Sequence, residues 1–384
     1  MHNSSGALQL ASWQRWSLAA GAAGLIVCAG GGVLLPEQFY RSWLIAWVFW
    51  AWLSLGMLGL LLIQSLIWSN WGRAARPILV SGAEVLPLMA VLFLPVLLEP
   101  ERLYEWARPD AVAHDHRLQH KQPWLNETAF RVRAGVYLVA WVGILLLVPR
   151  RLLPDHADAP GAPLETIPLR GPALALLMLT ASFAAFDWMM SLEPLWYSSI
   201  YGAIFAIEGL LAGMAASVLI FVACRRETGF VEFATPQLFN DFGNLLLAFT
   251  ILWGYVEFSQ FLIIWAGNLP DEIVWYLKRS AGGWQVLIVV VAVLHLVVPF
   301  FLLLSRDVKR DPVRLAGVAG LLLVMRYVEN YWTLAPAYGA SGVPVHWLDA
   351  AALVGIGGVW LAAALFRLRA SVKSVSSVPS VVYS

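Results

Sequence analysis

The sequence predicts an all-α, polytopic integral membrane protein with about ten transmembrane helices in bundles, and three observations lead to this prediction. Of the 384 residues, 60% are hydrophobic. Only 13% are charged, whereas an ordinary soluble domain has about 25%. The apolar residues also run in stretches of about 20, the length that an α-helix needs to cross a hydrocarbon core about 30 Å thick. A soluble globular protein and a disordered chain are both excluded.

Ten stretches have the required length and composition. In chain order, the first six are expected near residues 16–35, 43–68, 79–98, 130–148, 172–190 and 200–223. The last four are expected near residues 242–266, 284–304, 313–329 and 347–366. The first stretch is as apolar as a signal peptide, but residues 36–42 contain no small-residue cleavage site, so we expect it to remain as a helix.

Polar segments divide the chain into a first membrane part, residues 1–153, and a second, residues 172–370. The first part has four helices and contains a long outer loop of mixed charge at 99–133. The second part has six helices. Residues 154–171 (PDHADAPGAPLETIPLRG) are expected to form a cytoplasmic linker. The Ser- and Val-rich residues 371–384 are expected to form a disordered cytoplasmic tail.

The distribution of Lys and Arg predicts the orientation. An even number of spans places both termini on one side of the membrane, and the segments on that side contain 15 Lys and Arg residues. The opposite side contains nine, six of them in the loop at 99–133. By the positive-inside rule, both termini are cytoplasmic. Over the whole chain, 25 Lys and Arg balance 24 Asp and Glu, so no basic excess is available for a nucleic-acid partner.

The chain has few of the side chains that ligate redox metals. Its two cysteines, Cys28 and Cys224, lie far apart and outside any CxxC or CxxCH motif, which argues against an iron-sulfur cluster or a c-type haem. His295 is the one histidine inside an expected span, and a membrane haem with two His ligands needs two. His114, His116 and His120 are closely spaced in a loop, but Arg117 and Lys121 would repel a cation. We therefore expect no bound metal and no covalent cofactor.

Polar residues inside or close to the expected spans are the main functional candidates, because an ionisable residue costs roughly 3 kcal/mol in a membrane helix unless it is paired or hydrated. Most of them fall in the outer half of the membrane, and His295 lies near the middle. The candidates for a proton pathway or for the surroundings of a quinone are Asp187, Glu193, Glu208, Glu257, Gln260, His295, Arg326 and Glu329.

Two interpretations of these candidates stay open at the level of sequence. In the functional one, they form a proton path or the polar end of a quinone or substrate pocket. The charge of Arg326 would then keep the carboxylates ionised or ready to exchange a proton. In the structural one, Glu257 and Arg326 form a buried ion pair that fixes helix order, since breaking such a pair destabilises a protein whatever its role. His295 is similarly either a packed or hydrogen-bonded residue or a proton relay.

Four segments resemble a known family. They are residues 186–202 (FDWMMSLEPLWYSSIYG), 246–265 (LLAFTILWGYVEFSQFLIIW), 270–279 (PDEIVWYLKR) and 112–126 (VAHDHRLQHKQPWLN). These runs resemble the ActF family of membrane proteins from bacterial alternative complex III, a quinol:electron-acceptor oxidoreductase. The membrane components of that complex are related to the NrfD and polysulfide-reductase type. The matches extend from about the second expected helix to the ninth.

The resemblance implies a multi-pass component of a respiratory complex in the bacterial inner membrane. Haem and iron-sulfur groups would then belong to partner subunits, a homologous membrane subunit would lie nearby, and electrons would pass from quinol to an acceptor such as cytochrome c. This chain would contribute a proton pathway, a quinone-adjacent pocket, or both. Two other classes remain as alternatives: a secondary solute transporter with a midplane site, and a purely structural membrane scaffold.

Overall fold

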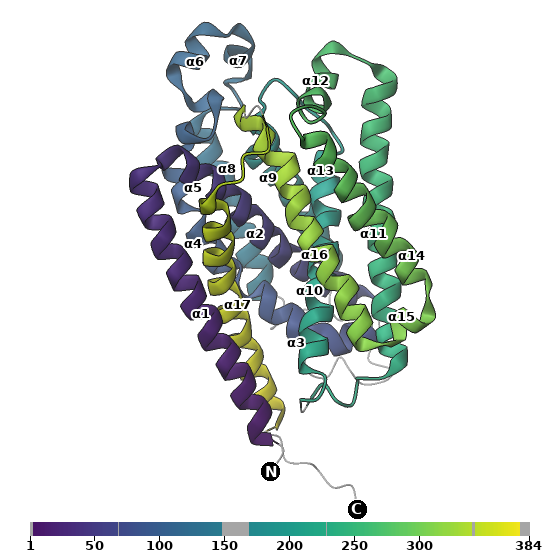
Figure 1. Ribbon diagram of the computed structural model, residues 1–384. Helices are drawn as coiled ribbons and strands as arrows, with labels where there is room; N and C mark the ends of the chain where they lie inside the picture. The colour runs from purple at the N-terminus through teal and green to yellow at the C-terminus, as the bar shows by residue number, and fades with distance from the viewer. Residues whose placement is uncertain (1–2, 68, 148–168, 228, 340–341, 377–384) are drawn as a thin grey trace, which may run out of the picture.

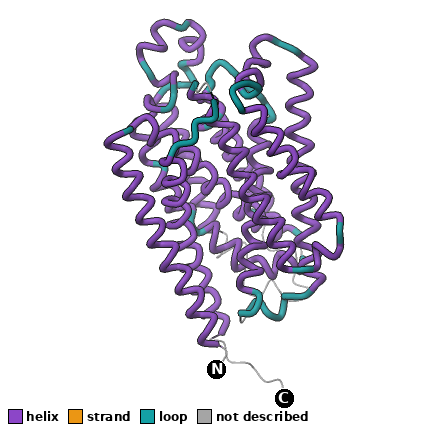
Figure 2. The backbone as a smooth tube through the Cα atoms, in the orientation of Figure 1, coloured by secondary structure: helices purple, strands orange, loops and turns teal. Residues whose placement is uncertain are grey.

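The computed structural model describes residues 3–67, 69–147, 169–227, 229–339 and 342–376. In these ranges the chain contains no strand, and nine helices are long and apolar enough to cross a membrane. The prediction of an all-α polytopic membrane protein is therefore confirmed. Figure 2 shows the helices side by side, with most loops gathered at the two ends of the bundle.

The described helices, in chain order, begin with α1 (Asn3–Leu34), α2 (Pro36–Leu66), α3 (Asn70–Ala83), α4 (Leu86–Leu92), α5 (Leu94–Leu98), α6 (Pro109–His114), α7 (His116–Lys121), α8 (Glu127–Leu147) and α9 (Arg170–Trp188). They continue with α10 (Tyr201–Cys224), α11 (Pro236–Gly267), α12 (Pro270–Lys278), α13 (Trp284–Val291), the π-helix η6 (Ala292–Val297), α14 (Val298–Leu304), α15 (Arg306–Arg310), α16 (Pro312–Leu334) and α17 (Trp347–Ser376). Short 3-10 turns lie at Pro100–Arg102, Glu105–Ala107, Met190–Leu192 and Ala335–Tyr338.

The ninth expected span, at 313–329, is α16, which is not among the nine apolar helices. It has 23 residues, enough for about 35 Å at 1.5 Å per residue. Arg326, Glu329 and Asn330 lower its hydropathy, and all three are buried among the other helices. The helix is thus long enough to span a membrane, although these polar residues make it less apolar than the other nine.

Two of the expected spans are interrupted. The third runs from Asn70 to Leu98 as α3, α4 and α5, with a proline in each piece: Pro77, Pro87 and Pro95. A proline removes a backbone donor and breaks the helical hydrogen-bond ladder. The eighth is continuous in direction but changes to a π-helix between α13 and α14.

The helix α2 lies at the centre of the bundle, and 94% of its most apolar 18-residue stretch is buried. It packs chiefly against α10, α3 and α17, and α10 packs in turn against α16, α11 and α9. The helix α1 lies along α17 (Figure 1). The two membrane parts expected at 1–153 and 172–370 are therefore divisions of the sequence, because their helices are interleaved in space.

The start of α1 and the end of α17 lie at the same end of the bundle (Figure 1), called here the termini end. The short helices α6, α7 and α12 lie at the opposite end, called the α7 end. Residues 154–168 of the expected linker fall outside the described residues, as do 377–384 of the expected tail. The helix α17 continues through Ser376, so the expectation of disorder from residue 371 is wrong for residues 371–376.

Glycines allow the closest helix contacts. A Cβ on Gly56 of α2 would lie 1.7 Å from the carbonyl oxygen of Gly209 on α10. Between α1 and α17, a Cβ on Gly24 would lie 2.6 Å from the backbone nitrogen of Gly355, and a Cβ on Gly358 would lie 2.5 Å from that of Gly21. Small residues at such crossings bring backbones together and favour association of membrane helices through van der Waals packing.

Candidate functional site

Five of the predicted residues meet where α10, α11, η6 and α16 pack together. They are Glu208 of α10, Glu257 of α11, His295 of η6, and Arg326 and Glu329 of α16, which we call the acidic cluster. All are buried except Glu257, which is partly exposed. Counted along each helix from its end nearest α7, the three acids lie about 8 to 15 Å deep. The cluster thus occupies the half of the bundle nearer the α7 end.

Arg326 joins two of the three acids. Its Nη1 donates a hydrogen bond of 2.9 Å to Oε2 of Glu329, and its Nη2 forms an ion pair with Oε2 of Glu208. The structural interpretation is therefore wrong about the partner of Arg326, which pairs with Glu208 and Glu329 and not with Glu257. Glu257 forms neither an ion pair nor a hydrogen bond with any residue in the described part of the chain.

Glu329 has two further partners. Nε1 of Trp253 donates a hydrogen bond of 2.7 Å to its Oε1, and Nδ1 of His295 lies 3.2 Å from its Oε2. The rings of Trp253 and His295 lie against each other with their centres 4.3 Å apart. His295 thus contacts the central carboxylate of the cluster, as both the structural interpretation and the proton-relay interpretation allow.

The π-helix η6 presents His295 to the cluster. Pro299 has no amide hydrogen, so the carbonyl of His295, four residues earlier, lacks its usual α-helical donor. The chain widens into π-helical turns at Ala292–Val297. Such segments occur often at functional sites, because they change the direction in which side chains point.

The cluster contains more acids than bases. Three carboxyl groups face one guanidinium and one imidazole, and unpaired charges are costly in an apolar interior. Carboxylate oxygens of Glu208, Glu257 and Glu329 lie within 4.8 Å of one another, close enough to share a metal ion. However, the guanidinium of Arg326 already contacts two of these three acids and would repel a metal. The arrangement is therefore better suited to holding protons than to holding a cation.

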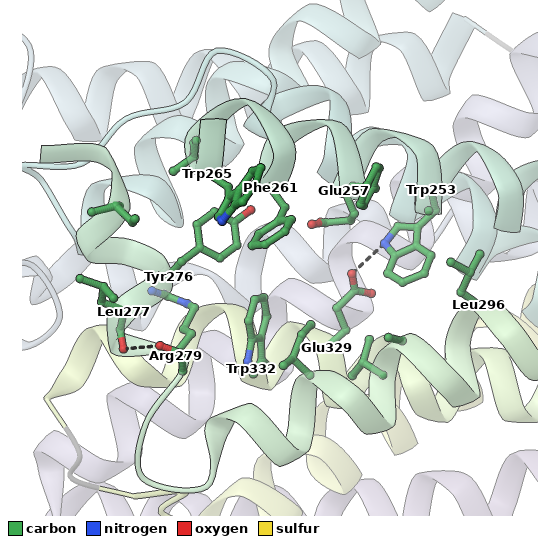
Figure 3. Close-up of a pocket in the computed structure, with 18 residues that line it drawn as sticks. Trp253, Glu257, Phe261, Trp265, Tyr276, Leu277, Arg279, Leu296, Glu329 and Trp332 are labelled. Atoms are coloured by element: carbon green, nitrogen blue, oxygen red, sulfur yellow. Dashed lines mark hydrogen bonds between the residues drawn. The ribbon is translucent and has the colours of Figure 1, made fainter. Parts of the chain in front are cut away.

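A cavity of about 540 Å³ ends on this cluster. It lies between α11, α12, α13, η6 and α16, and Glu257 and Glu329 line it together with Trp253 (Figure 3). Tyr276 and Arg279 line its part nearer the α7 end. The other walls are almost entirely apolar, with contributions from Phe258, Phe261, Ile264, Trp265, Leu277, Ile288, Leu296 and Trp332. Phe258, Trp265 and Leu277 are also exposed on the side of the bundle, so the cavity opens sideways.

Gln260 and Glu193 belong to a second polar group at the α7 end of this cavity. Gln260 accepts a hydrogen bond of 2.8 Å from Oγ of Ser198, and its Nε2 lies 3.3 Å from the Tyr276 hydroxyl. Glu193 pairs with Lys278 at 2.8 Å and with Arg279 at 2.7 Å.

Asp187 lies apart from both groups. It accepts two hydrogen bonds from Arg133, at 2.7 and 3.0 Å, one of 2.8 Å from the Tyr137 hydroxyl and one of 2.9 Å from Trp124 Nε1. These partners come from α8 and from the loop expected at 99–133. The contacts favour a structural role, in which Asp187 attaches that loop to the end of α9.

The histidines of the same loop have separate partners. Nδ1 of His114 lies 2.7 Å from the carbonyl oxygen of Asp110, and Nδ1 of His116 lies 3.2 Å from the side-chain oxygen of Gln119. Among the described residues, the one group spaced to share a metal is the trio Glu208, Glu257 and Glu329.

Three residues of the site were not predicted from the sequence: Trp253, Tyr276 and Arg279. Trp253 lies one helical turn before Glu257, so its position on the same helix face was available from the spacing. Tyr276 and Arg279 lie in or next to α12, outside every expected span, and the sequence singled them out only as members of the run 270–279, without a role.

Comparison with known proteins does not assign the chain to a family. No protein-family model matches the sequence, and a search of curated proteins finds no match either.

Proposed function

We propose that this chain is a membrane component of a quinol:electron-acceptor oxidoreductase of the alternative complex III type. In this proposal it contributes a quinol-adjacent cavity and a proton-accepting cluster, while partner subunits hold the redox metals. The observation that carries the proposal is the sideways-opening apolar cavity that ends on Glu257 and Glu329. The four sequence runs that resemble the ActF family support the same conclusion.

The cavity has the chemistry that a quinol requires. A quinol combines a flat ring carrying two hydroxyl groups with a long apolar tail, and it reaches its site through the bilayer. Aromatic walls formed by Trp253, Phe261 and Trp332 would accept the ring, while the exposed Phe258 and Trp265 would border the tail. Ligand pockets commonly combine apolar walls with a few polar groups that fix orientation.

The carboxyl groups would take up the protons of the reaction. Oxidation of one quinol yields a quinone, two electrons and two protons. The electrons pass to haem or iron-sulfur groups of the partner subunits. Glu257 faces the cavity and has no ion-pair partner among the described residues, so it is the acid best placed to accept the first proton, with Glu208 and Glu329 behind it. Arg326 balances part of the negative charge of the cluster.

The proposal includes a location and an orientation. The complex would lie in the bacterial inner membrane, with both termini cytoplasmic and the α7 end facing outward, as the Lys and Arg distribution indicates. The acidic cluster, in the half nearer α7, would then release protons to the outside. The loop that contains α6 and α7 would face the extramembrane partner subunits.

The variant Glu257→Gln tests the proposal in the purified complex. We expect quinol oxidation to fall at least tenfold, because the amide cannot accept a proton, while the haem content of the complex stays unchanged. The matched control is Glu127→Gln, since Glu127 pairs with Arg131 on the exposed surface of α8. Wild-type turnover and proton yield in an intact Glu257→Gln complex would refute the proposal.

One observation favours a purely structural role as the second candidate. The network of Arg326, Glu208 and Glu329 links α10 to α16, and buried ion pairs can specify helix packing without chemistry. Glu257 lies outside this network, so the same variant separates the two candidates. A scaffold role predicts that Glu257→Gln leaves turnover unchanged.

A further inference from the structure

We propose that Glu193, held by Arg279, is the exit through which protons pass from the quinol cavity to water at the α7 end. The inference rests on the proposed function and adds a route to it. Its basis is the position of Arg279 and Glu193 between two cavities of different character.

The first cavity is the apolar one described above, and Arg279 lines its part nearer the α7 end (Figure 3). The second has a volume of about 210 Å³ and a much more polar wall. Glu193 and Lys278 line it together with Glu105, Arg117 and Asp271. Arg279 is only 2% exposed, and its Nη2 lies 2.7 Å from Oε2 of Glu193. This ion pair therefore joins the two cavities.

Polar side chains lead from the acidic cluster toward this pair. Gln260 follows Glu257 by one turn of α11, and its Nε2 contacts the Tyr276 hydroxyl. Tyr276 in turn precedes Arg279 by one turn of α12 and lines the apolar cavity. Burial, more than the nearby Glu257, raises the pKa of Tyr276. Its hydroxyl stays protonated and can receive one proton while passing on another.

Arg279 positions the acceptor and does not carry the proton, because a guanidinium is not deprotonated in proteins. Its Nη1 donates to the carbonyl oxygen of Trp275 at 3.0 Å, and its Nη2 also donates to that of Thr333 at 2.6 Å. These contacts hold the guanidinium in place whether Glu193 is charged or neutral. A proton arriving at Glu193 forms a carboxylic acid, which then releases it to water in the polar cavity.

The variant Glu193→Gln tests the exit in the purified complex, reconstituted in vesicles with a pH indicator on the α7 side. We expect proton release to slow at least tenfold, whereas electron transfer in the first turnover proceeds at the wild-type rate. Azide, a small weak acid that fits the polar cavity, should restore release. The control Glu127→Gln should release protons as the wild type does.

Several results would overturn the proposal. Wild-type release in an assembled Glu193→Gln complex is one, and a release defect that azide does not correct is another, since it would indicate a structural role. If Glu193→Gln does not assemble, Glu193→Asp keeps a carboxylate on a shorter side chain and should still release protons. An assembled Glu193→Asp complex that releases none, with or without azide, would also refute the exit. In each case first-turnover quinol oxidation would persist, so failure of the exit differs from failure of the proposed function.

Discussion

The three acids of the cluster have the same chemistry but different surroundings. Glu329 is fixed by Arg326, Trp253 and His295, and Glu208 is paired with Arg326. Glu257 has none of these contacts and faces the cavity. A carboxyl group with fixed partners stabilises helix packing, whereas one without them can exchange a proton at small structural cost. The contacts thus divide one cluster into a structural part and an exchanging part.

The variant Arg326→Met should destabilise the chain by about 3 to 5 kcal/mol, because it leaves Glu208 and Glu329 buried without a counter-charge. Adding Glu208→Gln to the same chain should recover part of that loss, since one uncompensated charge disappears. Denaturant unfolding in detergent would measure both variants. A single variant as stable as the wild type would show that Arg326 does not balance these acids.

Sequence alone could predict which residues belong to the cluster but not how they pair. Glu208, Glu257, His295, Arg326 and Glu329 were recognisable because a charged residue in a membrane helix is costly and therefore rarely accidental. Pairing depends on the rotation of each helix about its axis and on the approach of its neighbours, neither of which is encoded locally. For that reason the predicted partner of Arg326 was wrong, and Asp187 was grouped with residues that it does not contact.

At the scale of elements, the departures from regular helices concern the third and eighth spans. Pro77, Pro87 and Pro95 were visible in the sequence and could have predicted the breaks in the third. The π-helix was harder to predict, because Pro299 marks a disruption but does not specify its type. The spacing of apolar residues located nine spans, and α16 was located in spite of its polar residues.

The crossing of α2 and α10 depends on Gly56. The variant Gly56→Ala should prevent normal packing of these helices, because its Cβ would meet the Gly209 carbonyl oxygen at 1.7 Å and neither backbone can move freely in the core. The yield of folded chain after size-exclusion chromatography would measure the effect. Gly143→Ala is the control, since a Cβ there has no neighbour within 4 Å. Equal yields from the two variants would contradict the close crossing.

At the scale of the whole molecule, the polar groups are distributed unevenly along the membrane normal. The acidic cluster and the pair of Glu193 with Arg279 both lie in the half nearer the α7 end. Near the termini end, the described polar contacts include the hydrogen bond of 2.7 Å between Lys309 and Asn244, which connects α15 to α11. This asymmetry favours proton exchange with one side of the membrane.

The proposed orientation predicts which positions react with a membrane-impermeant thiol reagent. Introduced as His116→Cys, a thiol on α7 should be labelled from outside the cell, whereas one introduced as Arg306→Cys at the start of α15 should react only after permeabilisation. The native Cys28 and Cys224 are buried, so they add little background. Labelling with the opposite sidedness would reverse the orientation.

The pairing of α1 with α17 also affects how the chain is made. Among the described helices, α1 is synthesised first and α17 last, so Gly21 and Gly24 meet Gly355 and Gly358 only after the described helices between them have been made. Until then the glycine face of α1 must be covered by lipid or by another protein. This pair therefore forms late in synthesis, and a chain truncated before residue 347 leaves α1 without its main partner.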